Sequence, residues 1–121
     1  SVIETIPAMM NALRMIWIIS RHYNTDELMV PLMERIAWEL CERVTKVINV
    51  RNLFQYDTHI IKNITSAAIR TLDTWKKSYF TVRARIESSG RDVRWEFDRS
   101  KLFDRTDYIS IICQDLYDMA Q

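Results

Sequence analysis

Hydrophobic residues recur every three or four positions along most of this chain, which is the spacing of helices with one buried face. The longest such stripe lies between residues 57 and 88 and predicts a helix of roughly 30 residues. Asp57 or Thr58 is placed to cap its start. Ser88-Ser89-Gly90 ends it, because glycine readily adopts the left-handed conformation that follows a helix. The members of the stripe are Ile61, Ile64, Ala68, Leu72, Trp75, Tyr79, Val82 and Ile86.

A first helix is predicted from Thr5-Ile6-Pro7, a cap with proline in the first turn, to about His22. Apolar residues cover nearly its whole circumference, and a helix of this kind must be covered on more than one side. We therefore expect it in the interior of the fold. Its narrow polar wedge consists of Asn11, Arg14, Arg21 and His22.

The second helix is predicted to begin near Pro31. Asn24 and Glu27 have the spacing of a capping box, and the proline that follows them indicates a short turn ahead of the main helix. Residues 49–56 then form a connection to the long third helix. The apolar positions of the second helix are Met33, Ile36, Leu40, Val44 and Val47.

Trp38 lies on the polar side of that helix, between Glu34 and Glu42. Either another helix of the same bundle covers this tryptophan, or the covering surface belongs to another part of a parent chain or to a separate subunit. The sequence leaves both explanations open. Under the second, these three residues are candidates for a partner-binding site.

The segment after Gly90 departs from the helical pattern. Val93, Trp95 and Phe97 alternate with polar residues, which is the period of an extended segment with one buried side. This predicts a rigid corner in which Trp95 and Phe97 are buried, while arginines at and beyond it pair with nearby acids. The residues assigned to the corner are Arg94, Trp95, Phe97, Asp98, Arg99 and Arg105, of which the three arginines are the expected ion-pair partners.

Asp98 and Thr106 are both good helix caps, and we predict that the last helix begins at about Asp107. The apolar face expected for this helix consists of Tyr108, Ile109, Ile112, Cys113, Leu116 and Met119.

Other functions for the corner are disfavoured by its charge. Seven basic residues lie between residues 83 and 105, but five acids are interleaved with them, whereas a nucleic-acid platform needs a positive groove with exposed aromatic rings. Arginines beside carboxylates lower carboxylate pKa values, which suits ion pairs and not a general acid. The whole chain has 17 basic and 16 acidic residues and a formal net charge of +1, which argues against bulk attraction to nucleic acid or anionic membrane.

The scarcity of turn-forming residues, with one glycine and two prolines, favours long helices over sheets. We predict an all-α fold: an elongated bundle of about four helices, with a short extended corner before the last one. The chain starts at Ser1 and reaches Gln121 without a cap, so residues 1–121 are expected to be a single helical-bundle segment of a larger protein. No stretch reaches the ~18 uncharged apolar residues of a membrane span, and none is predicted.

Catalytic chemistry has little basis in this sequence. A single glycine excludes glycine-rich phosphate loops and nucleophile elbows. His22 and His59 lack metal-ligand spacing, and Cys41 and Cys113 fall on or beside apolar stripes, as small core residues of a reduced, intracellular protein do. An enzyme site assembled from these four residues is the weakest of the functional classes, and no cofactor or metal is predicted.

Two long stretches stand out, NALRMIWIISRHYNTDELMVPLMERIAWEL, residues 11–40, and VRARIESSGRDVRWEFDRSKLFDRTDYISIICQDL, residues 82–116. They resemble the N-terminal tail, or stem, of axonemal dynein heavy chains. Their marks are the turn from Ser20 to Asp26, the helix start from Pro31 to Ile36 and the corner from Arg94 to Arg99. The resemblance covers nearly the whole chain.

The resemblance implies a structural and interaction role. In this family the all-α tail holds heavy chains together, carries intermediate and light chains, and anchors the motor to the doublet microtubule of a cilium or flagellum. The implied partners are therefore other parts of the heavy chain and other axonemal dynein subunits, and the implied location is the cytoplasm and the axonemal cytoskeleton. The ATPase ring lies far downstream, so this segment is not expected to hydrolyse ATP. The competing class is a stand-alone intracellular helical adaptor that shares these patterns.

Overall fold

The computed structural model describes residues 2–22, 26–49, 57–93 and 95–119 of the chain. These residues form four helices and no strand, which confirms the all-α prediction. The helices are α1 (Val2–His22), α2 (Asp26–Val47), α4 (Thr58–Ser88) and α5 (Arg99–Met119).

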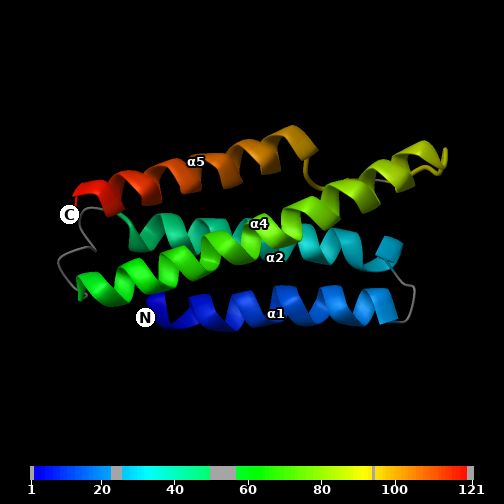
Figure 1. The fold of residues 1–121 in the computed structure, drawn as a ribbon. Coiled ribbons are helices and arrows are strands. Elements are labelled where there is room, and N and C mark those ends of the chain that lie inside the picture. The colour runs from blue at the N-terminus through cyan, green and yellow to red at the C-terminus, as the bar shows by residue number, and fades with distance from the viewer. Residues whose placement is uncertain (1, 23–25, 50–56, 94, 120–121) are drawn as a thin grey trace.

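The four helices lie side by side in an elongated bundle (Figure 1). α2 and α4 pack against each other in the middle, and α1 and α5 each pack against both of them from opposite sides. α1 begins and α5 ends at the same end of the bundle. The core lies between the two central helices and their neighbours, and its fully buried large side chains include Met33, Leu40, Leu72, Tyr79 and Ile109.

α4 follows the prediction closely, with 31 residues. The Asp57 carboxylate accepts a hydrogen bond from the backbone N–H of His59 at 2.8 Å, which caps the first turn. At the other end, the backbone N–H of Ser89 donates to the carbonyls of Arg85 and Ile86, both at 3.1 Å. Gly90 follows with φ of 74°, a left-handed conformation that glycine adopts without strain.

The predicted starts of the first two helices are wrong. α1 begins at Val2, and the Thr5 hydroxyl donates to the Val2 carbonyl within the helix instead of capping it. α2 begins at Asp26 and passes through Pro31 without a break. Val30 and Met33 are both completely buried, so core packing on either side of the proline keeps this stretch helical despite the lost hydrogen bond. Asn24, the predicted cap, lies outside the described residues.

The last helix starts earlier than predicted. α5 begins at Arg99, because the Asp98 carboxylate accepts a hydrogen bond from the Ser100 N–H at 2.8 Å and caps the first turn. Thr106 lies inside the helix, where its hydroxyl donates to the Phe103 carbonyl. Leu102 and Ile109 are buried two turns apart, so the helix is set by an apolar stripe that already starts before Asp107. The described residues between α4 and α5, 89–93 and 95–98, are not helical.

α1 lies at the edge of the bundle, not in its interior as predicted (Figure 1). One face is buried, and it contributes Ile3, Ile6, Met10 and Leu13 to the core. Away from that face, Ile18 is 60% exposed and Met15 54% exposed. By length and composition α1 would also be long enough and apolar enough to cross a membrane, a test that core helices of soluble proteins pass as well.

Candidate functional site

Trp38 is half-buried, and much of its cover comes from this chain itself. Its indole ring stacks on the ring of Phe97 in the corner, with 5.2 Å between ring centroids and 28° between ring planes. From α5, the Lys101 ammonium lies 5.4 Å and the Arg105 guanidinium 5.8 Å from the Trp38 ring centroid. The structure therefore supports the explanation that other parts of the same bundle cover Trp38. A contact between Trp38 and an outside partner stays a prediction.

Glu34 is completely buried on α2. Its Oε2 lies 3.5 Å from Nη1 of Arg83 on α4. Burial raises the pKa of this carboxyl to about 7, although the neighbouring Arg83 charge and a hydrogen bond from Tyr79 act in the opposite direction. Its Oε1 has no hydrogen-bond partner among the described residues. Glu34 is thus an inward-facing group in this bundle, and its contact with an outside partner stays a prediction.

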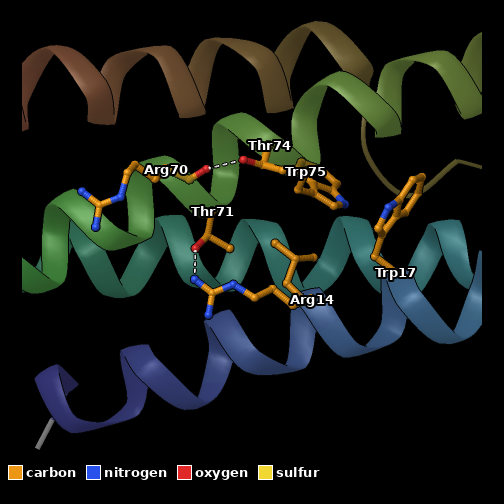
Figure 2. A pocket seen from close by; sticks show the side chains of 7 residues that line it. Arg14, Trp17, Arg70, Thr71, Thr74 and Trp75 are labelled. Atoms are coloured by element: carbon orange, nitrogen blue, oxygen red, sulfur yellow. Dashed lines mark hydrogen bonds between the residues drawn. The ribbon is translucent and has the colours of Figure 1, made fainter.

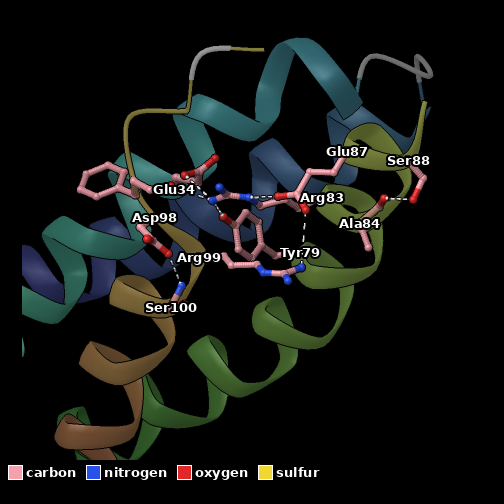
Figure 3. A network of polar contacts seen from close by, with 10 residues as sticks. Glu34, Tyr79, Arg83, Ala84, Glu87, Ser88, Asp98, Arg99 and Ser100 are labelled. Carbon is pink, nitrogen blue, oxygen red and sulfur yellow. Dashed lines mark hydrogen bonds and ion pairs between the residues drawn. The ribbon is translucent and has the colours of Figure 1, made fainter. Parts of the chain in front are cut away.

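Arg83 is the centre of a polar network that joins α2, α4 and the corner (Figure 3). It is 5% exposed, although it is an arginine. Its Nε donates to Glu87 Oε1, and its Nη1 donates to the Tyr79 hydroxyl and the Phe97 carbonyl, each at 2.8 Å. The Trp95 ring covers it, with 4.2 Å between the guanidinium carbon and the ring centroid. The sequence analysis did not single out Arg83. Two features could have indicated its burial: it lies next to Val82 of the apolar stripe, and it stands four residues before Glu87, the spacing of an ion pair on one helix.

The predicted corner is only partly as expected. Phe97 is buried, whereas Trp95 is only half-buried and lies over Arg83. Arg99 pairs with Glu87 at 3.5 Å, and Arg94 lies outside the described residues. Asp98 serves as the cap of α5, and hydrogen bonding by the Ser100 backbone lowers the pKa of its carboxyl.

Another ion pair ties α5 to α2. Arg105 Nη2 lies 2.7 Å from Glu42 Oε1, so Glu42 is also engaged within the chain. Glu96 at the corner pairs with Arg35 of α2. Glu34 and Glu42, two of the candidates for a partner-binding site, thus each have a cation of the same bundle beside them, and their contact with an outside partner stays a prediction.

The two cysteines are both buried. Burial raises the pKa of the Cys41 thiol to about 12 and that of the Cys113 thiol to about 11, so both are protonated at neutral pH. Among the residues that the structure describes, no group of three or more His, Cys, Asp or Glu side chains is arranged to hold a metal ion.

A different surface opens where α1 meets α4. Two hollows of about 270 and 400 Å³ lie there in succession and share Trp17; we call them together the α1–α4 seam. The first is lined by Leu13, Arg14, Trp17, Arg70, Thr71, Thr74 and Trp75. The second is lined by Trp17, Arg21, Lys77, Ser78, Thr81, Val82 and Arg85.

In the first hollow the two indole rings lie at one end, and both guanidinium groups extend toward the other (Figure 2). Arg14 Nη2 donates to the Thr71 hydroxyl at 2.7 Å, which ties α1 to α4. Trp75 is 5% exposed, and its indole N–H has no acceptor among the described residues. A buried donor left without an acceptor costs about 1–3 kcal/mol.

The charge of the seam is one-sided. Its lining includes five basic side chains and no carboxylate. Within the described part of the chain, Arg14, Arg21, Arg70 and Lys77 form no ion pair. Arg21 instead lies over the Trp17 ring, with 5.7 Å between its guanidinium carbon and the ring centroid. The exposed apolar residues of α1 adjoin this basic strip, since Ile18 is four residues from Arg14 and three from Arg21.

A comparison with protein families matches the whole chain, residues 1–121, to the family described as dynein heavy chain, N-terminal region 1. No solved structure matches it.

Among curated proteins, the chain is 62% identical over 120 residues to the human protein "Dynein axonemal heavy chain 10". It is 42% identical over 120 residues to "Dynein-1-alpha heavy chain, flagellar inner arm I1 complex" and 27% identical over 117 residues to "Dynein beta chain, flagellar outer arm", both from Chlamydomonas reinhardtii. These alignments cover 99%, 99% and 97% of this chain but 3% of the length of each relative.

Proposed function

The chain belongs to the dynein heavy-chain family, in N-terminal region 1, and from this we propose that it is a structural and interaction segment of a ciliary dynein tail. In this role it supports heavy-chain assembly, the attachment of intermediate and light chains, and docking of the motor to the doublet microtubule. Its partners are other parts of the heavy chain and other axonemal dynein subunits. Its location is the axoneme of a cilium or flagellum, reached from the cytoplasm. ATP hydrolysis by the parent motor takes place outside these residues.

The family match along the entire chain is the observation that carries this proposal. The fold agrees with it, because an elongated bundle of parallel and antiparallel rods suits a stem that transmits force and presents side surfaces to neighbours (Figure 1). The exposed apolar row on α1 agrees as well, since large apolar residues gathered on one helix face favour contact with another protein.

An inner-arm position is the finer assignment that the sequence identities favour. Identity is 42% to the alpha heavy chain of a flagellar inner-arm complex and 27% to an outer-arm beta chain. The sequence identity to the beta heavy chain of the same inner-arm complex is 26%. The identities therefore favour an alpha-type heavy chain of such an inner arm.

A stand-alone adaptor is the alternative, and the relatives disfavour it. Each relative is a heavy chain of which this chain spans about 3%. On the proposal, residues 1–121 therefore work as one segment within a much longer tail.

The test disrupts this segment inside the full-length heavy chain in ciliated cells. Leu40→Asp together with Leu72→Asp places two charges in the core, where both side chains are at most 2% exposed. We expect loss of the heavy chain from axonemes and loss of co-purifying intermediate and light chains. The exposed change Asn63→Asp is the control and leaves both unchanged. Normal axonemal incorporation and a normal subunit complement with the disrupted segment would refute the proposal.

A further inference from the structure

We propose that the α1–α4 seam is a docking groove for an acidic amphipathic helix from another polypeptide segment of the same dynein complex. The inference rests on the proposed function, because it names the surface and the chemistry through which this segment holds a neighbour. The occupant places carboxylates over the basic strip and apolar side chains over Trp17 and Ile18.

Charge complementarity is the main support. The chain as a whole is almost neutral, with 17 basic and 16 acidic residues, yet every charged residue that lines the two hollows is basic. Arg70 and Lys77 are exposed and lie two helical turns apart on α4, while Arg14 and Arg21 have the same spacing on α1. Two parallel rows of cations with a repeat of seven residues match carboxylates on one face of a helix that lies between them.

Apolar surface adjoins the cations in a way that suits an amphipathic partner. Trp17 belongs to both hollows and is half-buried, so part of its ring is available at the middle of the groove. Ile18 stands at the rim and is 60% exposed. Tryptophan and arginine are among the residue types enriched in the anchor regions of protein interfaces.

Nucleic acid fits this surface less well. Binding of single strands relies on aromatic rings whose faces are open for stacking, but Trp75 is 5% exposed. The net charge of +1 supplies no long-range attraction for a polyanion. An acidic helix needs only the local excess of cations that the seam provides.

The experiment replaces Ile18 by a photo-crosslinking amino acid in the full-length heavy chain, expressed in ciliated cells. Isolated axonemes are irradiated, and the attached peptide is sequenced by mass spectrometry. We expect adducts with a segment rich in Asp and Glu that carries apolar residues at helical spacing. Arg70→Glu with Lys77→Glu lowers the yield of this adduct roughly tenfold, because like charges then face each other. The charge-keeping pair Arg70→Lys with Lys77→Arg is the matched control and keeps the yield.

A second crosslinker position, at the exposed Ile111 of α5, controls for general contact with neighbours. Its adducts are expected to be unaffected by the charge reversal. The inference is overturned if Ile18 attaches to a basic or neutral segment, to nucleic acid or to lipid. It is also overturned if Ile18 gives no adduct while the heavy chain is present in axonemes. Absence of the unaltered heavy chain from axonemes is a different result, which counts against the proposed function.

Discussion

The corner between α4 and α5 and the α1–α4 seam are both rich in arginine and tryptophan, yet their arginines have opposite surroundings. Around the corner, Arg83 of α4 and Arg99 and Arg105 of α5 each pair with a glutamate. Along the seam, Arg14, Arg21 and Arg70 pair with no carboxylate of the described chain. The arginines of the corner region therefore close the fold through ion pairs. Along the seam, Arg14 ties α1 to α4 through the Thr71 hydroxyl, while Arg21 and Arg70 have no carboxylate partner in the described chain and are left for an outside one.

This difference separates residues that stabilise the segment from residues that connect it. A buried cation in a matched network cannot be removed without leaving its partners uncompensated. A solvent-exposed cation without a partner can be removed at little cost to folding. Variants in the two regions are therefore expected to differ strongly in their effect on stability.

The largest effect is expected at Arg83. Arg83→Leu removes the cation beside the buried Glu34 and the donor to the Phe97 carbonyl. We expect the free energy of unfolding of the 121-residue chain to fall by about 3–5 kcal/mol, because Glu34, the Tyr79 hydroxyl and the Phe97 carbonyl lose the buried group that they contact. Urea denaturation followed by circular dichroism measures it. Arg99→Leu, which breaks an exposed pair, is the control and should cost less than about 1 kcal/mol. Equal effects of the two variants would contradict the network described here.

Glu34 should make stability depend on pH. Its folded-state pKa of about 7 lies above the ordinary value of 4.5, so the folded protein holds a proton that the unfolded chain has already lost. The stability that this bound proton contributes to folding is fully present below about pH 4.5, and it is lost as the pH rises through about 7. The wild type should lose up to about 3 kcal/mol relative to Glu34→Gln over this range. The measurement is the free energy of unfolding by urea as a function of pH. If it changes equally with pH in the two proteins, the pKa of Glu34 is not raised in the folded state.

A smaller effect is expected at Trp38. Trp38→Ala removes a half-buried ring that stacks on Phe97, and we expect a loss of about 1–3 kcal/mol in the free energy of unfolding. Thermal unfolding at neutral pH measures the change. Trp38→Phe keeps an aromatic ring and should recover most of it. If stability is unchanged while heavy-chain assembly fails, Trp38 is a partner anchor and belongs with the seam in this comparison.

The smallest effect is expected at the seam. Arg70→Ala with Lys77→Ala removes two exposed cations that form no ion pair with a described residue, so the free energy of unfolding should change by less than about 0.5 kcal/mol. Arg105→Ala is the matched variant on the other side of the molecule and should cost about 1 kcal/mol through the lost Glu42 pair. A larger loss at the seam than at Arg105 would mean that these cations hold the bundle together.

Periodic apolar spacing predicted the helices themselves well, but only the start of α4 was predicted correctly. Asp57 and Gly90 act through neighbouring backbone, so the sequence alone identified both ends of α4. Pro31 looked like a helix start because local rules disfavour proline within a helix. Burial of Val30 and Met33 outweighed that local preference, and such burial depends on helices far away in the sequence.

The site was harder to predict because it depends on which faces of different helices meet. Glu34 and Trp38 share the polar side of α2, yet one faces Arg83 and the other stacks on the corner. The seam combines the polar wedge of α1 with one flank of α4, and only the packed bundle brings the two together. The sequence showed that α1 is apolar on nearly all sides. It could not show that the bundle would cover only one of these sides and leave Met15 and Ile18 exposed.

The most direct test of this account is a structure of the intact axonemal dynein complex by electron microscopy, at a resolution that traces side chains. The account predicts that an acid-rich helix from outside residues 1–121 lies in the α1–α4 seam and against Ile18, while Trp38 remains stacked on Phe97. A seam open to solvent in the assembled complex, with the neighbouring chains in contact only with other faces of the bundle, would contradict it.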